Sequence, residues 1–333
     1  MDDVPFVFCE SVCATLGLVG VWYAKDLSGD YGRLARLAVR HEYRYVAVIK
    51  DGVVQEKHLH SRYTNVEVQV SDEVEAVPKK VRRVSFHLYD TKRESVAECI
   101  RIARLFPYAS YRFDLFSSSI SEAWADFASS LRRLDCVEIT EKLDSDALRL
   151  FQKLVTGRKL CTLIMFAGAC EGGNIEMLKT LLCQDQFKKL RICNSFAGPW
   201  KNWDGDAVGE LLQFWSENSE KLRGKILLLD RNCKGSAKQL EQFVLRRASH
   251  TATEDLGKVL KVCSKEECDF VNREYQHNHW MFAKPSCIYK YEDARKRSAR
   301  HRIYVSFECP TGYDGCDDLT VMQHTTCLQI LFS

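Results

Sequence analysis

Short apolar bursts alternate with longer amphipathic stretches between about residues 81 and 250. The burst VRRVSFHLYD at 81–90 has apolar residues at every second position over most of its length, which is the pattern of a strand with one buried face. The stretch NIEMLKTLLCQ at 174–184 repeats apolar residues at the spacing of one helical face. The burst centres lie near Phe86, Phe113, Val137, Leu163, Ile192 and Leu227. The pattern predicts about six β-α units, with a period of roughly 24 to 36 residues that is typical of repeat proteins.

Two folds produce a regular β-α alternation: a doubly wound sheet with helices on both faces, and a solenoid with all helices on one face. A doubly wound sheet has nearly continuous apolar strands and a glycine-rich turn after the first of them. The bursts of this chain instead keep charged residues between apolar ones, such as Arg112 and Asp114 on either side of Phe113. We therefore expect an α/β fold of the β-α repeat solenoid type, similar to leucine-rich repeats. A doubly wound α/β sheet is the alternative.

The segments that flank the repeats carry different patterns. The Asp51-Gly52 pair lies between two strand-like stretches and predicts a hairpin turn. Four residues at predicted helix starts are good N-caps: Thr91, Ser121, Asp144 and Asn174. These patterns together predict five segments along the chain. They are a helical segment at 1–42, a small β extension at 43–80, β-α repeats at 81–250, a C-terminal cap with a β-hairpin at 251–310, and a turn-like tail at 311–333.

The composition is that of a globular protein in a reducing compartment. The formal net charge of +3 is small for 333 residues, which argues against nucleic acid as a partner. The cysteine count of 15 is odd and no signal peptide pattern is visible, so we expect reduced thiols. Five cysteines at apolar positions of predicted elements are expected to be buried: Cys99, Cys136, Cys161, Cys183 and Cys193.

The longest apolar stretch is CTLIMFAGAC at 161–170, about half of what a membrane-spanning helix needs. We therefore expect no membrane partner, and the reduced thiols predict a cytoplasmic or nuclear location.

The sequence VPFVFCESVCATL at 4–16 predicts a short helix with Pro5 in its first turn, where the missing N–H costs nothing. Four of its apolar residues recur at every fourth position: Val4, Phe8, Val12 and Leu16. From the pattern alone, a helix that packs on the β extension accounts for these residues.

The same spacing resembles the opening of an F-box. In that family a leucine-proline pair is followed by a glutamate, two aliphatic residues, an isoleucine and a closing leucine. Val4-Pro5 matches the pair, Phe8 and the cysteine after it match the aliphatic residues, Val12 matches the isoleucine, and Leu16 closes the motif. The chain departs from the family at Val7, which stands in the place of the glutamate.

The chain also resembles the nematode families of F-box-like proteins, which often begin with Met-Asp, two residues, then Pro and FCE. An F-box followed by leucine-rich-repeat-like units is similar to the substrate receptors of cullin-RING ubiquitin ligases. The resemblance implies a non-enzymatic interaction protein without a cofactor. Its first helices would bind the ligase adaptor subunit through Val4, Pro5, Phe8, Val12 and Leu16, and its repeats would bind an unknown target protein. An enzyme on a doubly wound sheet and a scaffold that has lost adaptor binding are the alternatives.

Trp200 and Trp203 are the candidate target-binding residues. They lie in GPWKNWDGDAVGELLQFW at 198–215, which lengthens one repeat by a loop. Aromatic side chains on loops are common binding anchors. A loop tryptophan that closes the end of a local core is the other explanation.

Three further patterns are better explained without a ligand. A short span holds Cys263, Cys268, His277 and His279, but its H-x-H spacing is not the usual zinc-binding pair. The basic cluster Arg295, Lys296, Arg297, Arg300 and Arg302 lacks the aromatic residues of a nucleic-acid platform, and a solvated hairpin end is favoured over a localisation signal. The Gly172-Gly173 pair lacks the lysine of a phosphate loop and predicts a turn. We predict no metal site and no catalytic residue.

Overall fold

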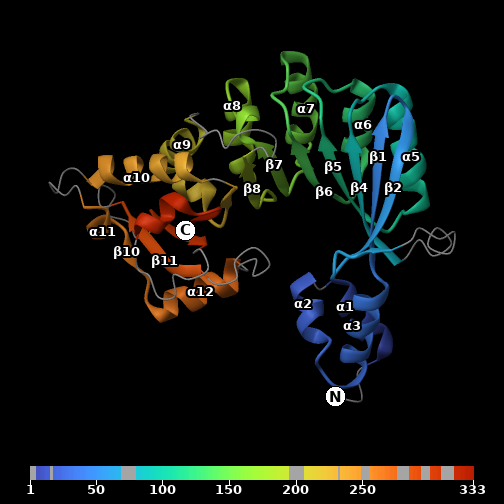
Figure 1. Ribbon diagram of the computed structural model, residues 1–333, viewed down its shortest axis with the longest axis horizontal. Helices are drawn as coiled ribbons and strands as arrows, with labels where there is room; N and C mark the ends of the chain where they lie inside the picture. Colours follow the sequence, from blue (N-terminus) through green and yellow to red (C-terminus); the bar gives the residue numbers. More distant parts are fainter. Residues whose placement is uncertain are drawn as a thin grey trace. The chain divides into compact units, whose positions relative to one another are not determined.

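The computed structural model describes residues 5–15, 18–68, 80–194, 206–231, 233–248, 255–275, 285–293, 301–308 and 319–333. The chain divides into two compact units. The first unit comprises residues 1–116 and 120–135, and the second comprises 117–119 and 136–333. Strands and helices alternate in the repeat region of both units, so the predicted α/β class is confirmed (Figure 1).

The first unit joins a helical segment to a sheet. Its described elements are α1 (Phe6–Thr15), α2 (Leu18–Ala24), α3 (Gly29–His41), β1 (Tyr43–Lys50), β2 (Val53–Ser61), β3 (Glu67–Val68), β4 (Val81–Leu88), α5 (Arg93–Leu105), β5 (Ser110–Leu115) and α6 (Glu122–Ser130). The strand order is β5-β4-β1-β2-β3, in which β4 runs parallel to β1 and β5. The antiparallel β1/β2 hairpin turns at Asp51-Gly52 as predicted, with φ angles of 50° and 75°.

The second unit continues the β-α alternation and ends in antiparallel strands. Its described elements are β6 (Leu134–Ile139), α7 (Ser145–Thr156), β7 (Thr162–Phe166), η2 (Ala167–Ala169), α8 (Gly173–Leu182), β8 (Lys189–Cys193), α9 (Ala207–Leu222), β9 (Ile226–Asp230), α10 (Lys234–Ala248), α11 (Leu256–Val259), β10 (Lys261–Val262), α12 (Lys265–Tyr275), β11 (Pro285–Glu292), β12 (Arg302–Glu308), η4 (Leu319–His324) and β13 (Cys327–Phe332). The strand order is β10-β11-β12-β13-β9-β8-β7-β6. Strands β6 to β9 are parallel neighbours. The pairs β9/β13, β13/β12, β12/β11 and β11/β10 are antiparallel.

Period-2 alternation decides which strand residues form the core of the first unit. Val84, Phe86 and Leu88 of β4 are at most 1% exposed. Phe86 stacks on Phe113 of β5 with ring centroids 5.1 Å apart, and Phe113 meets the edge of Trp124 from α6 at 5.6 Å. The residues between these apolar ones stand on the opposite face of the strands.

The predicted N-caps are right at two helices and wrong at two. The side chains of Ser121 and Asp144 each accept a hydrogen bond from the backbone N–H three residues later, at 3.2 and 2.7 Å. Asn174 lies inside α8 instead, and its amide donates to a backbone carbonyl of the preceding turn at 2.7 Å. Gly172 is the N-cap there, with a φ of 66° that favours glycine. Thr91 does not cap α5, since its hydroxyl accepts from the backbone N–H of Ser121 at 2.7 Å.

The cysteine predictions hold at buried element positions and fail at one strand entrance. Cys99, Cys136 and Cys193 are buried free thiols, and Cys183 is half-buried. Cys161 is exposed, because it lies directly before β7 and outside the paired strand.

A strand near the end of the chain corrects the prediction of a turn-like tail. β13 lies between β9 and β12, and all six of its residues are buried. A strand covered on both faces has a continuous apolar pattern rather than an alternating one, and its partners are distant in the sequence. None of the described helices has both the length and the apolar character that crossing a membrane requires.

Candidate functional site

The helices α2 and α3 share a small core with the residues that follow β2. Val21, Ala24, Ala35 and Tyr63 form its buried centre. α3 lies close to the residues after α2. A Cβ atom added at Gly32 would lie 1.8 Å from the carbonyl oxygen of Leu27. Only glycine fits at this contact without a shift of the backbone.

Glu42 fastens this helical segment to the sheet. It follows α3 directly and is 8% exposed. Its carboxylate accepts hydrogen bonds from Arg62 Nη1 at 2.6 Å, Arg82 Nε at 2.9 Å and the Tyr63 hydroxyl at 3.0 Å. Burial, and then the charge of Glu42, raise the pKa of Tyr63 above its ordinary value, so the phenol stays a donor. One carboxylate thereby connects α3, the end of β2 and β4.

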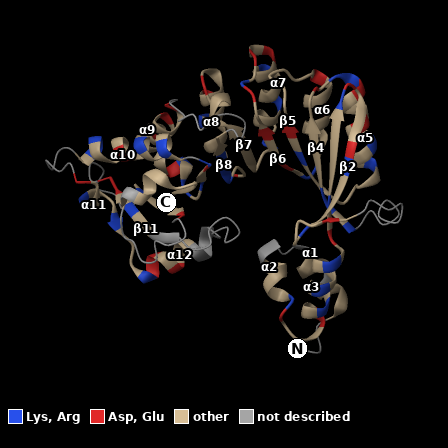
Figure 2. Cartoon of the chain, viewed as in Figure 1, with Lys and Arg blue, Asp and Glu red and all other residues tan. Residues whose placement is uncertain are grey.

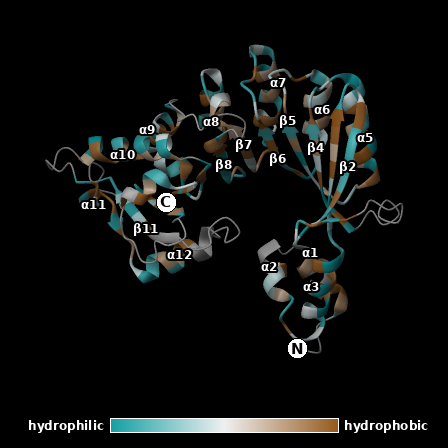
Figure 3. Ribbon diagram, in the orientation of Figure 1, coloured by the Kyte–Doolittle hydropathy of each residue, from teal (hydrophilic) through white to brown (hydrophobic). Residues whose placement is uncertain are grey.

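Large apolar side chains are exposed on the helical segment far more than elsewhere. Six of the eleven exposed large apolar residues in the described chain belong to α1, α3, and α2 with its following turn: Phe6, Val7, Phe8, Tyr23, Leu27 and Leu37. The three on α1 are consecutive, with exposed fractions of 42%, 70% and 55%. Hydrophobic residues are visible on these helices in Figure 3. Concentrated exposed apolar surface is typical of a protein contact. We call these six residues the apolar helical surface.

The predicted adaptor-binding residues do not all belong to this surface. Pro5 precedes α1, and its carbonyl accepts from the backbone N–H of Phe8 at 2.9 Å in the first helical turn. Phe8 is exposed, whereas Val12 is half-buried. Val4 and Leu16 lie outside the described residues. Phe6 and Val7 were not predicted to bind the adaptor, because the four-residue spacing favoured a different face of the helix.

A second group of side chains lies on the sheet of the first unit, opposite α5 and α6. It comprises Arg44 of β1, His58 and His60 of β2, His87 of β4, and Arg112 and Asp114 of β5, which we call the polar face. The strand register brings them together, since Arg44 pairs with His60 and His87 pairs with Asp114. They line a hollow of about 540 Å³. Blue and red segments of the strands in Figure 2 mark charged residues of this sheet.

Asp114 is the most buried charge of the polar face, with a side chain 9% exposed. Its carboxylate accepts from Arg112 Nε at 2.6 Å and lies 3.0 Å from His87 Nε2. Burial by itself would raise the pKa of Asp114, but the hydrogen bond from His87 and the charge of Arg112 outweigh it and hold the pKa below its usual range. Asp114 is therefore ionised and fully engaged.

His58 lies between two carboxylates. Its Nδ1 is 2.7 Å from Glu67 Oε1, and its Nε2 is 3.0 Å from Glu56 Oε2. The hydrogen bonds with Glu67 and then Glu56 raise the pKa of His58 above 6.5. The protonated ring satisfies both acceptors, so His58 is cationic near neutral pH more often than a free histidine.

Arg44 and His60 differ from the other members of the polar face. Arg44 Nη2 donates to the amide oxygen of Asn65 at 3.0 Å, but Arg44 forms no ion pair within the described chain. Its Nε and the Nδ1 of His60 are both buried without a hydrogen-bond partner there. Burial, and then the charge of Arg44, lower the pKa of His60. Two neighbouring nitrogen groups thus lack acceptors.

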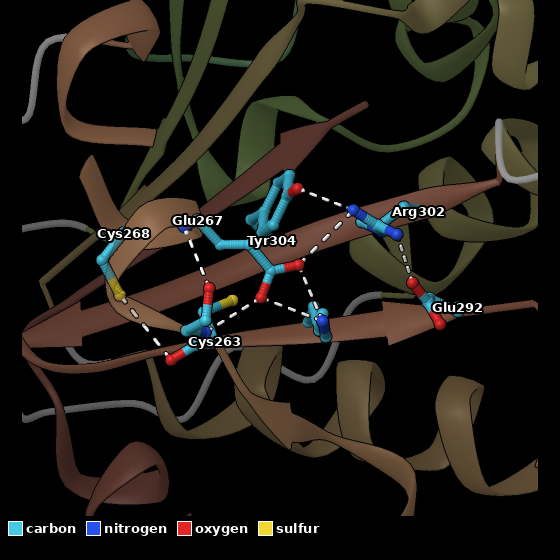
Figure 4. A network of polar contacts seen from close by, with 8 residues as sticks. Cys263, Glu267, Cys268, Glu292, Arg302 and Tyr304 are labelled. Carbon is cyan, nitrogen blue, oxygen red and sulfur yellow. Dashed lines mark hydrogen bonds and ion pairs between the residues drawn. The ribbon is translucent and has the colours of Figure 1, made fainter. Parts of the chain in front are cut away.

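The second unit holds a polar network at the start of α12 (Figure 4). The Ser264 N–H donates to Glu267 Oε2 at 2.9 Å, and the Glu267 N–H donates to Ser264 Oγ at 3.3 Å, which is a capping box. Lys290 Nζ donates to both oxygens of Glu267, at 2.7 and 2.9 Å. Arg302 Nη1 donates to the Tyr304 hydroxyl at 3.0 Å and lies 3.5 Å from Glu267. The network fastens α12 to β11 and β12.

Two free cysteines, Cys263 and Cys268, lie beside this network. Cys263 is buried beneath α12, and the Cys268 thiol donates to its carbonyl at 3.9 Å. Burial and the charge of Glu267 raise the pKa of Cys263 to about 12, which disfavours the thiolate that binds zinc. Within the described residues, no three His, Cys, Asp or Glu side chains are placed to hold a metal ion.

Several residues singled out from the sequence lie outside the described residues: His277, His279, Trp200, Trp203, Arg295, Lys296, Arg297 and Arg300. Arg302 begins β12 and forms an ion pair with Glu292.

No protein-family model matches the chain, and no curated protein sequence matches it either.

Proposed function

We propose that this chain is a non-enzymatic interaction protein that docks the adaptor subunit of a cullin-RING ubiquitin ligase through α1 to α3 and acts as a substrate receptor. The apolar helical surface is the observation that carries the proposal. Phe6, Val7 and Phe8 expose apolar area to water. A partner that buries this area would gain about 25 cal/mol of binding free energy per Å². The F-box-like spacing of Pro5, Phe8 and Val12 supports the choice of partner.

The anchoring of the helical segment fits this role. A helix that binds the adaptor can hold the rest of the chain in a defined position only if it is rigidly attached to the sheet. The three hydrogen bonds accepted by Glu42 provide that attachment. The mechanism is proximity, in which the receptor raises the local concentration of a bound target near the ligase.

We further propose that the β-α repeats form a solenoid similar to leucine-rich repeats. The parallel strands of each unit are ordered as in the sequence, β4-β5 in the first and β6 to β9 in the second. Right-handed connections between sequential parallel neighbours put every helix on the same face. A doubly wound sheet instead reverses its strand order at a switch point, where its ligands bind.

The buried thiols also favour an interaction protein over a thiol enzyme. Burial raises the pKa of Cys193 to about 11 and that of Cys327 to about 12. A nucleophilic cysteine needs a lowered pKa, because the thiolate is the reactive form.

The test is a binding titration of the full chain with the purified adaptor subunit. The variant combines Val7→Asp with Phe8→Asp, which places two charges on the apolar helical surface at exposed positions. We expect its affinity to fall by at least about a hundredfold, since each fully desolvated charge costs several kcal/mol. Circular dichroism checks that the variant remains folded.

Val53→Asp is the matched control. Val53 is 56% exposed, but it lies at the start of β2, outside the helical segment. Its affinity for the adaptor should equal that of the wild type. No binding by the wild type, or equal binding by the wild type and the double variant, would contradict the proposal.

A further inference from the structure

The polar face contains a place where an anion would complete the hydrogen bonding. Arg112 shares Asp114 with His87, and His58 is held between Glu56 and Glu67. Arg83, on the same side of β4, forms an ion pair with Asp135 at 2.8 Å. Arg44 is thus the one arginine of this face that has no carboxylate partner in the described chain.

The charges around Arg44 also favour an anion at this position. Burial lowers the pKa of Arg44, the charges of Arg112 and then Arg83 lower it further, and the charge of Asp114 offsets them only in part. Its hydrogen-bond partner on this face, Asn65, is a neutral amide. Like charges that converge in a partly buried hollow are costly without a counter-ion. An oxyanion that enters the hollow would relieve this repulsion and accept from the guanidinium.

His60 supplies the second donor. It pairs with Arg44 in the β1/β2 register, so the two side chains stand side by side on one face. Nδ1 of its ring is buried without a hydrogen-bond partner in the described chain. A proton on Nδ1 would make it a donor to an anion that lies against the ring.

We propose that the polar face of the first unit binds an oxyanionic group, a phosphoryl or a carboxylate, between Arg44 and His60. Binding takes up a proton at His60 Nδ1. The site rests on contacts within the sheet and is independent of adaptor docking, so either proposal can fail without the other.

Calorimetric titration of the full chain tests the site with defined probes. N-acetyl-O-phosphoserine amide and N-acetyl-aspartate amide carry the two anionic groups, and N-acetyl-serine amide is neutral. We expect at least one anionic probe to bind and the neutral probe not to bind. The tighter of the two anionic probes identifies the group. Failure of both, or equal binding of the neutral probe, overturns the proposal.

Arg44→Gln should weaken the anionic probe by at least about tenfold, since a charge-assisted hydrogen bond is lost. The matched control is Arg101→Gln. Arg101 lies on α5, pairs with Glu98 at 2.9 Å and is half exposed. Its affinity should stay at the wild-type value. Equal affinities of wild type and Arg44→Gln, or an equal loss in Arg101→Gln, overturn the assignment.

The pH dependence separates His60 from a purely structural role and remains decisive if Arg44→Gln does not fold. Inorganic sulfate is the probe, because it keeps its charge over the range used. Its affinity should rise several-fold from about pH 7.5 to about pH 5.5, as His60 takes up its proton. The groups that face His60 are Arg44 from β1, His58 from its own strand and Glu67 from β3. His60→Gln should flatten this rise, while a variant with the wild-type slope overturns the role of His60.

Discussion

Nε2 of His87 lies 3.0 Å from Oδ2 of Asp114, across the parallel strands β4 and β5. The two residues belong to successive repeats, and their register places them directly opposite each other. The same carboxylate accepts from Arg112, so one buried charge serves a histidine and an arginine. Polar residues between the apolar positions of the strands thus help to align neighbouring repeats.

Replacing Asp114 by Asn should destabilise the first unit by about 3 kcal/mol, because it removes the buried charge that accepts from Arg112 and faces His87. Asp135→Asn is the control, since Asp135 pairs with Arg83 at 2.8 Å but is 36% exposed. That variant should lose no more than about 1 kcal/mol. Urea unfolding followed by circular dichroism measures both. A loss at Asp114 no greater than that at Asp135 would show that the carboxylate does not align the strands.

The stability of the first unit should depend on pH through His58. Its folded-state pKa is raised by Glu67 and Glu56 above the unfolded value. The stabilisation is therefore fully present below about pH 6.5 and is lost as the pH rises through the folded-state pKa. The difference in unfolding free energy between wild type and His58→Gln should be larger at about pH 6 than at about pH 8. An equal difference at both values would mean that the two carboxylates do not hold a protonated ring.

Glu42→Gln should loosen the helical segment. The neutral amide cannot replace a carboxylate that accepts from Arg62, Arg82 and Tyr63, and we expect a loss of about 3 kcal/mol. Hydrogen exchange should accelerate in α3 and leave α7 unchanged. Glu94→Gln, at an exposed position of α5, should change stability by less than about 0.5 kcal/mol. Unchanged exchange in α3 would show that another contact holds the segment.

Gly32→Ala should disrupt the packing of α3 against the turn that follows α2. The added Cβ would lie 1.8 Å from the Leu27 carbonyl oxygen, so the backbone must shift. We expect a loss of at least about 2 kcal/mol. The same change at Gly168 meets no atom within 4 Å and should have little effect. Thermal unfolding of the two variants compares them, and equal melting temperatures would refute the close contact.

The sequence predicts the parts of this fold that depend on local patterns. Alternation in β4 and β5, the Asp51-Gly52 turn, and the caps at Ser121 and Asp144 all follow from neighbouring residues. Long-range pairing is different. The parallel contact of β1 with β4 joins segments about 30 residues apart, and nothing local specifies it.

The polar face was missed for this reason. Glu56, His58 and His60 alternate along β2, which is a visible signal of one shared side. Their approach to His87 and Asp114 depends on the order β5-β4-β1-β2, which arises only in the folded sheet. β13 was missed because its run CLQILF is apolar on both faces and has no alternation to detect.

Hydrogen–deuterium exchange of the full chain, with and without the adaptor subunit, tests the central claim most directly. The proposal predicts that the amides of α1 gain protection when the adaptor binds, together with those near Tyr23, Leu27 and Leu37. Strands β6 to β9 should exchange at unchanged rates. Binding that protects other segments while α1 exchanges as before, or an adaptor that changes no exchange rate, would contradict docking through the apolar helical surface.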